Sequence, residues 1–320
     1  MSSHNPISPE QRQHINLSQY AFDVVQNDAL TFMGKINNSG FICRILYNCS
    51  ESFFDEVDLK NKTYSKDVPL KIRLNNDVID DYYPTDGEWF GAKHRITQGE
   101  YIKALLEQYA RMPFFDRESI FYKQTILTIN NHIDNTDPHK GILPIIYQDG
   151  NKYYIKPYRL SFDYEAQYHY LICMSTKNPN EEMRPASFRL TRIKGIKQPV
   201  TSYGTGMIKS KESKELERRI KENGVPYIFG DTMDYVVKLT TAGLDMYNSI
   251  FHQRPIYTTI QKEEQNTYYL TFHSTERQIT NYFFQFGKEA MIVSPDKTRV
   301  WIRNRYEAAL ESYDQSSLSV

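Results

Sequence analysis

Four arginines lie close together in the middle of the sequence, on segments that read as neighbouring β-strands. Arg189 and Arg192 interleave with apolar residues along the segment ASFRLTRIKGI, whereas Arg159 and Arg184 belong to the segments before it. An arginine side chain holds an oxyanion through two parallel hydrogen bonds, and its flat guanidinium also stacks on bases. A concave β-surface with several guanidiniums and tyrosine hydroxyls therefore predicts a binding site for phosphate or a nucleotide.

Residues that could instead perform catalysis or hold a metal occur in two places. The segment His132–His139 contains two histidines and two aspartates, but Asn135 and the pair Asp137-Pro138 are typical of a turn. Three aspartates between residues 77 and 81 are the acids expected in the first turns of a helix, because the helix dipole favours them there. We therefore expect a non-enzymatic protein with no metal and no cofactor.

The elements that would position the arginines are short strands separated by polar turns. They are LPIIYQ, NKYYIKPYRLSF, YHYLICMS and ASFRLTRIKGI, and they follow a helical stretch over residues 116–133. Several short strands in succession predict a small barrel or a strongly bent sheet. Such a sheet would place the arginines on one curved surface.

The first third of the chain contains an approximate duplication. In the first copy, a half-buried strand ends at Leu17, and Ser18 then caps the first of two helices. The second copy begins with a strand through Ile72, and a capping box at Thr97 starts its last helix. A short strand followed by two helices is the unit of ribbon-helix-helix proteins, whose paired strands enter the major groove of DNA.

The predicted ribbon has a polar outer face. Period-2 alternation directs the apolar strand residues to the helices and four others to the groove-facing side, namely His14, Asn16, Lys71 and Arg73. Lys71 and Arg73 are the only strong cations expected there, so the ribbon is modestly basic. A helical dimerisation module with a solvated ribbon stays an alternative.

The last third reads as a further domain. A charged helix over residues 210–223, closed by Gly224, forms a spacer. From Tyr235 onwards the elements follow the β-α-β-β-α-β order of a ferredoxin-like fold, and a final helix, RNRYEAALESY, comes after them.

Length and composition limit the classes of protein to which this chain can belong. A length of 320 residues predicts two or three domains, and the elements read along the chain indicate three, over residues 1–112, 113–200 and 201–320, in an α+β protein. Because the net charge is zero, binding to a polyanion has to come from local patches. Three cysteines are too few for a disulfide framework, and the sequence has neither a signal-peptide core nor an apolar run of about 18 residues. We expect a cytoplasmic protein that does not enter a membrane.

The segments KPYRLSFDYEAQYHYLICM and SFRLTRIKGI together resemble the WYL domain. In that family a Pro-Tyr-Arg-Leu-like strand, a Trp-Tyr-Leu tripeptide and an FRLDRI-like strand recur. Here the tripeptide is His169-Tyr170-Leu171, and Thr191 occupies the usual Asp position. The first third is similar to the ribbon-helix-helix segment of some WYL proteins, and the stretch from VKLTTAGLDMYNSIFHQRPI to FFQFGKEAMIVSP is similar to the extension after their WYL domains. The resemblance covers the whole chain.

The resemblance implies an Sm-like (SH3-like) five-stranded barrel whose basic pocket binds a nucleic acid or a nucleotide. The matching positions are Tyr158, Arg159, Tyr170, Arg189 and Arg192, and Arg184 in the connecting turn is added to them. The resemblance also implies that the C-terminal extension serves oligomerisation or ligand gating. We therefore expect a homodimer.

Two functions stay open. One is a DNA-binding transcriptional regulator whose ribbon reads an operator while its WYL domain senses a nucleotide or nucleic-acid ligand. The other is a WYL accessory protein of a type VI-D CRISPR effector in bacterial defence, which the chain resembles particularly, its QRPI segment included. Its ligand would be single-stranded RNA, or single-stranded DNA, and the effector would be its protein partner. The few cations on the ribbon and the clustered arginines and tyrosines favour single-stranded RNA.

Overall fold

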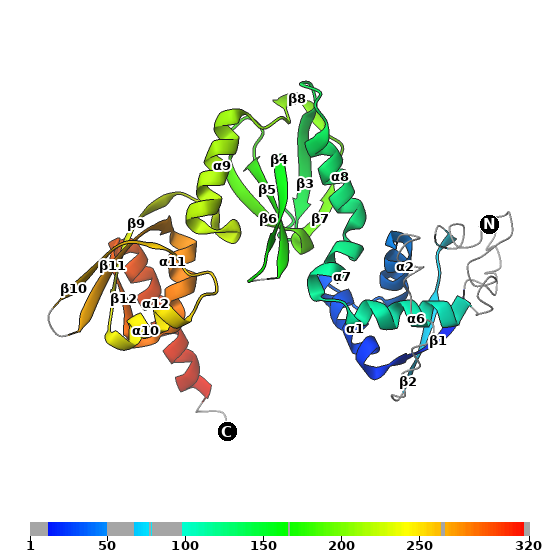
Figure 1. Ribbon diagram of the computed structural model, residues 1–320, viewed down its shortest axis with the longest axis horizontal. Coiled ribbons are helices and arrows are strands. Elements are labelled where there is room, and N and C mark those ends of the chain that lie inside the picture. The colour runs from blue at the N-terminus through cyan, green and yellow to red at the C-terminus, as the bar shows by residue number, and fades with distance from the viewer. Residues whose placement is uncertain are drawn as a thin grey trace. The chain divides into compact units, whose positions relative to one another are not determined.

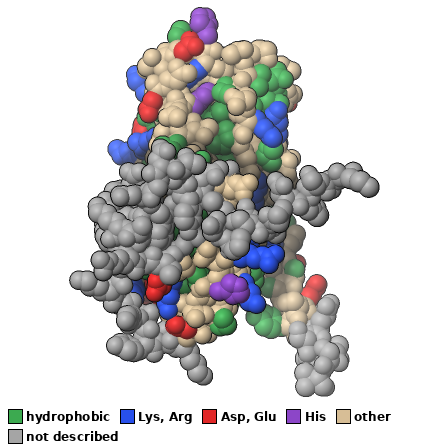
Figure 2. Space-filling model, turned by 90° about the vertical axis from the view of Figure 1, so that its right-hand side faces the viewer, with side chains coloured by type: hydrophobic (Ala, Val, Ile, Leu, Met, Phe, Trp, Pro, Cys, Tyr) green, Lys and Arg blue, Asp and Glu red, His purple; other side chains and the backbone are tan. Residues whose placement is uncertain are grey.

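The computed structural model of the protein describes residues 12–49, 67–76, 78, 98–165, 167–263 and 266–316 (Figure 1). The chain divides into two compact units, Met1–Thr128 and Ile129–Val320. No helix among the described residues is long and apolar enough to cross a membrane. Basic and acidic side chains are interspersed on the face drawn in Figure 2, in keeping with a net charge of zero.

The first unit contains a two-stranded ribbon and helices in the predicted order. Strand β1 (Arg12–Ser18) precedes helices α1 (Gln19–Met33) and α2 (Asn38–Asn48), and strand β2 (Asp67–Arg73) pairs antiparallel with β1 before helix α6 (Gln98–Arg111). Ser18 caps α1 as predicted, because its side chain accepts a hydrogen bond from the backbone N–H of Ala21. The predicted cap at Thr97 lies outside the described residues. The expected helical stretch after α6 is two helices, α7 (Phe114–Phe121) and α8 (Lys123–Asp134).

The apolar stripes of these helices form the core of the first unit, as their spacing predicts. The fully buried side chains include Val25, Phe41, Ile45, Leu105 and Tyr109. A buried carboxylate lies among them: Asp28 accepts a hydrogen bond from the Tyr109 hydroxyl at 2.8 Å and from Nε of Arg117 at 2.7 Å. Burial and this carboxylate hold the pKa of Tyr109 well above its ordinary value. The three side chains connect α1, α6 and α7.

The second unit begins with a bent antiparallel sheet. Its strands are β3 (Gly141–Tyr147), β4 (Lys152–Asp163), β5 (Tyr168–Thr176), β6 (Arg184–Arg189) and β7 (Ile193–Ile196), paired in the order β6-β5-β4-β3-β7, and β8 (Val200–Thr205) also pairs with β3. The predicted single strand ASFRLTRIKGI is wrong, since a 3₁₀ helix over Leu190–Arg192 divides it into β6 and β7. The described strands form an open ladder and not a closed barrel, because no pairing among them joins β6 and β7 at the two ends of the order.

The remainder of the second unit follows the predicted β-α-β-β-α-β order. Helix α9 (Ser210–Asn223) packs on β5 through Leu216, and strand β9 (Thr232–Leu239), helix α10 (Thr241–Ser249), strands β10 (Tyr257–Glu263) and β11 (Thr267–Thr275), helix α11 (Glu276–Phe283) and strand β12 (Ala290–Ser294) come next. The strands pair in the order β10-β11-β9-β12. Their core contains Val237, Leu270, Phe272 and Phe283, and helix α12 (Asp296–Ser316) ends the described chain.

Candidate functional site

One wall of a pocket in the second unit is built by strands β5 and β6. Tyr168 and Tyr170 are two residues apart on β5, as Ser187 and Arg189 are on β6, so each pair faces the same side of the sheet. Tyr170 lies directly opposite Arg189 in the ladder. Side chains at such cross-strand positions are neighbours, so a tyrosine and an arginine lie side by side on this wall.

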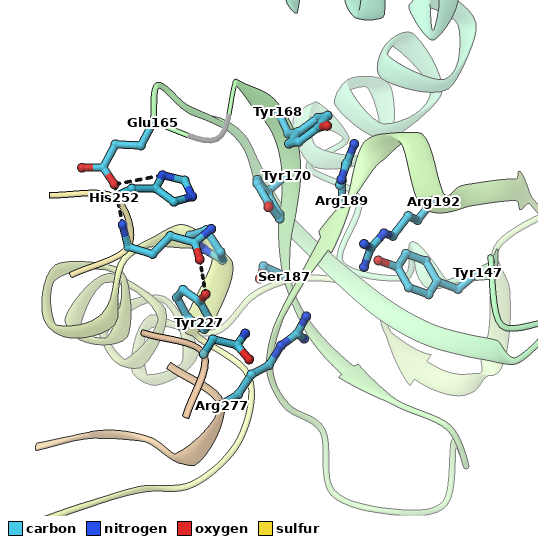
Figure 3. A pocket seen from close by; sticks show the side chains of 13 residues that line it. Tyr147, Glu165, Tyr168, Tyr170, Ser187, Arg189, Arg192, Tyr227, His252 and Arg277 are labelled. Atoms are coloured by element: carbon cyan, nitrogen blue, oxygen red, sulfur yellow. Dashed lines mark hydrogen bonds and ion pairs between the residues drawn. The ribbon is translucent and has the colours of Figure 1, made fainter. Parts of the chain in front are cut away.

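The 3₁₀ turn after β6 brings a second arginine to this wall. Arg192 is the last residue of the turn, and its neighbour Ile193 pairs with Tyr147 on β3. Figure 3 shows Arg192 beside Tyr147 and Arg189 beside Tyr168. A continuous strand would have spaced the two arginines differently, because they are three residues apart and would face opposite sides.

The opposite wall comes from the C-terminal half of the same unit. Arg277 and Asn281 are four residues apart on α11 and therefore share one face of that helix. Tyr227 ends a 3₁₀ turn after α9, and His252 and Gln253 belong to the segment between α10 and β10. In Figure 3, Arg277 extends from α11 toward the strands of the sheet.

The pocket between these walls has a volume of about 440 Å³. That size is within the range of pockets for nucleotide-sized ligands. Its lining is aromatic and basic, and it consists of Tyr147, Glu165, Tyr168, Tyr170, Ser187, Arg189, Arg192, Pro226, Tyr227, His252, Gln253, Arg277 and Asn281.

The three arginines of the pocket are available to a ligand. Within the described part of the chain, no carboxylate forms an ion pair with Arg189, Arg192 or Arg277. The Arg189 guanidinium carbon lies 3.0 Å from the centroid of the Tyr168 ring, and its buried Nε has no hydrogen-bond partner among these residues.

The tyrosine at the centre of the pocket stays protonated. Burial raises the pKa of Tyr170 to about 12; the carboxylate of Asp163 adds to the shift, and Arg189 and Arg192 oppose it. At neutral pH its hydroxyl can therefore donate a hydrogen bond to a phosphate oxygen.

A set of hydrogen bonds holds the segment between α10 and β10 against the pocket. The backbone N–H of Gln253 donates to Oε2 of Glu165 at 2.7 Å, and the Tyr227 hydroxyl donates to Oε1 of Gln253. Gln278 on α11 also donates through Nε2 to the Gln253 carbonyl at 3.4 Å. These bonds join the turn between β4 and β5 to the C-terminal half of the unit at the edge of the pocket.

Half of the residues predicted for the pocket lie elsewhere. Tyr158 and Arg159 contact α9, where the Tyr158 hydroxyl donates to Oε1 of Glu217 at 2.7 Å and Arg159 pairs with the same oxygen at 3.1 Å. The physical reason is a β-bulge between Pro157 and Arg159, which shifts the period-2 alternation. Arg184 is exposed and lines a different cavity, where Asp231 lies 3.9 Å away. Only Tyr170, Arg189 and Arg192 of the predicted set line the pocket.

The ribbon of the first unit presents the four predicted residues on its outer face. His14, Asn16, Lys71 and Arg73 are exposed, and their apolar neighbours face the helices. The prediction of only two strong cations is wrong, because β1 begins earlier than expected and exposes Arg12 directly opposite Arg73.

Comparisons with known proteins find a solved structure that has the same fold as this chain. No protein-family model matches the sequence, and no curated protein matches it. A crystal structure described as that of a CRISPR Cas-related protein matches with a TM-score of 0.73 and 20% identity, covering 99% of this chain and 97% of the other. The two chains share one fold. Proteasome accessory factor B/C of Arthrobacter aurescens aligns with a TM-score of 0.31 and 13% identity over 98% of this chain and 52% of its own, a likeness too low to support an argument.

The C-terminal lining of the pocket was missed by sequence reasoning. Arg277 and Asn281 have a spacing that many exposed helical pairs share, so it does not single them out. The QRPI segment was the one feature of the sequence that pointed to this lining, because its first residue is Gln253. His132, weighed as a metal ligand, is buried with Nε2 unpartnered, and no three His, Cys, Asp or Glu side chains of the described ranges come together as a metal site.

Proposed function

We propose that this chain is a non-enzymatic, CRISPR-associated protein that binds single-stranded RNA in the pocket around Tyr170. The observation that carries the proposal is the set of three arginines without ion pairs in the described structure, which line a pocket of about 440 Å³ together with four tyrosines. The shared fold with a CRISPR Cas-related protein supports the association with CRISPR. The same proposal includes the finer assignments. They are a WYL domain, a ribbon-helix-helix region, a ferredoxin-like domain, a type VI-D effector as partner and a homodimer.

Single strands suit this pocket better than duplex. A chain with zero net charge lacks the long-range attraction that gives duplex binders much of their affinity. Unpaired bases can stack on Tyr147 or Tyr170 while Arg189, Arg192 and Arg277 bind the backbone. These contacts act at short range and are open to a strand whose bases are exposed.

The expected result is tighter binding to RNA than to duplex DNA of the same length at physiological salt. Because stacking contributes about 1 to 3 kcal/mol per base, we expect a preference of at least about tenfold. Fluorescence anisotropy with matched unstructured RNA, single-stranded DNA and duplex DNA at two salt concentrations measures it. Tighter binding to random duplex would contradict the proposal.

A second candidate is a DNA-binding transcriptional regulator, and the ribbon favours it. Arg12 and Arg73 lie directly opposite each other, and His14 lies opposite Lys71, so one exposed face carries three strong cations. For this function the pocket would bind a regulatory nucleotide or nucleic acid.

Replacing Lys71 and Arg73 by alanine tests the ribbon. If the ribbon contacts DNA phosphates, duplex binding weakens and its salt slope becomes shallower by about one to two units, one for each lost contact. Arg111→Ala is the matched control, because Arg111 is an exposed cation in the last turn of α6, in the same unit but outside the ribbon. If the salt slope of the double variant equals that of the parent, the ribbon does not contact DNA phosphates and its role is structural.

A further inference from the structure

The proposed RNA pocket carries more positive charge than one internal phosphate of a strand neutralises. Its charged lining consists of one carboxylate, Glu165, and three arginines, Arg189, Arg192 and Arg277, which together give a formal charge of +2. A phosphodiester inside a strand carries a single negative charge. A terminal phosphate carries about −1.5 to −2 at pH 7, so it matches the charge of the pocket more closely.

The one carboxylate of the lining is already engaged at the edge of the pocket. Oε2 of Glu165 accepts a hydrogen bond from the backbone N–H of Gln253 at 2.7 Å and lies 3.7 Å from Nδ1 of His252. Figure 3 shows Glu165 beside His252 and away from Arg192. The Asp163 carboxylate acts on a neighbouring tyrosine but does not line the pocket. The guanidiniums are therefore left to an anion from outside the chain.

Two hydroxyl groups add uncharged donors to the same space. Tyr170 keeps its proton at neutral pH, and the Ser187 hydroxyl forms no hydrogen bond with a described residue. Ser187 is half-buried on β6, and Figure 3 shows Arg277 extending toward it from α11. A terminal phosphate offers three strong acceptor oxygens. It can therefore accept hydrogen bonds from both walls of the pocket at once.

The pocket is small for the interior of a strand. Its volume is about 440 Å³, which suits a ligand of the size of one nucleotide. Grooves that bind the interior of a single strand hold roughly 4 to 16 nucleotides. A site limited to one nucleotide suits the end of a strand, where the chain has to leave in one direction only.

We infer that the pocket binds the terminal nucleotide of a single strand through a phosphomonoester. Arg192 and Arg277 bind the phosphate from opposite walls, and the terminal base lies against the tyrosine rings. A 5′-phosphate and a 3′-phosphate offer the same chemistry. This inference rests on the proposed function, and it adds that the strand is recognised at a phosphorylated end.

Isothermal titration calorimetry with three unlabelled decauridylates tests the inference. One carries a 5′-phosphate, one carries a 3′-phosphate, and one has hydroxyls at both ends. We expect the parent to bind one of the phosphorylated strands at least about tenfold more tightly than the strand with two hydroxyl ends, because hydrogen bonds to charged groups are strong. The strand that gains affinity identifies the end that the pocket binds.

Arg277→Gln tests whether this preference arises in the pocket. The change lowers the formal charge of the lining from +2 to +1, so we expect the affinity for the phosphorylated strand to fall about tenfold and the preference to shrink to within about threefold. Arg277→Lys keeps the charge and should keep most of the preference. Arg305→Gln is the matched control, because Arg305 is exposed on α12 and does not line the pocket.

Two results would overturn the inference. One is equal affinity of the parent for the three strands, and the other is a preference that Arg277→Gln leaves unchanged, whether or not the overall affinity falls. Both results leave the proposed function standing, because the protein still binds a single strand. A parent that binds none of the three strands would instead refute the proposed function itself.

Discussion

Replacing Arg189 and Arg192 together by alanine is expected to weaken binding of single-stranded RNA by at least about a hundredfold. Hydrogen bonds to charged groups each contribute about 1.5 to 3 kcal/mol, and the two guanidiniums would supply several of them. The fold should survive, because both side chains line the pocket and neither forms an ion pair with a described carboxylate. Anisotropy titration and circular dichroism measure the two effects.

Arg159→Ala is the control that separates the pocket from the set of residues expected by resemblance. Arg159 already pairs with Glu217 on α9, so its removal should leave RNA binding within about twofold of the parent. If Arg159→Ala loses RNA binding while the double variant keeps it, the ligand binds at the α9 face and the pocket is not the site.

Asp28→Ala is expected to lower the free energy of unfolding of the first unit by about 3 to 5 kcal/mol. The change leaves the Arg117 guanidinium, whose side chain is 13% exposed, without its carboxylate, and it removes the acceptor of the Tyr109 hydroxyl. Removing one partner of a buried pair is costly because the other charge stays in a poorly solvated place. Urea unfolding followed by circular dichroism checks the size of the loss.

Two further variants show whether the buried pair causes that loss. Asp23→Ala changes an exposed aspartate on the same helix, and we expect an effect within about 0.5 kcal/mol. Adding Arg117→Leu to Asp28→Ala should restore part of the stability, because the unpaired charge is gone. An Asp28→Ala variant as stable as Asp23→Ala would show that the pair contributes nothing.

Most of the local elements and the two faces of the ribbon could be predicted from patterns between near neighbours in the sequence. Helical spacing identified the buried stripes through Val25 and Leu105, and period-2 alternation placed Lys71 and Arg73 on the exposed side of β2. Ser18 was identifiable as a cap because a cap is a contact within a few residues. These features depend on interactions between near neighbours in the chain, which a linear pattern records.

Tertiary structure decided which arginines meet in the pocket. The bulge at Pro157 turns Arg159 toward α9, and the 3₁₀ turn at Leu190 brings Arg192 back beside Arg189; neither break is visible in the alternation of residue types. Arg277 reaches the same pocket from α11, about a hundred residues further along the chain than the strands it faces. Contacts between segments so far apart depend on how sheets and helices pack, and the spacing of residues within one segment carries no record of that packing.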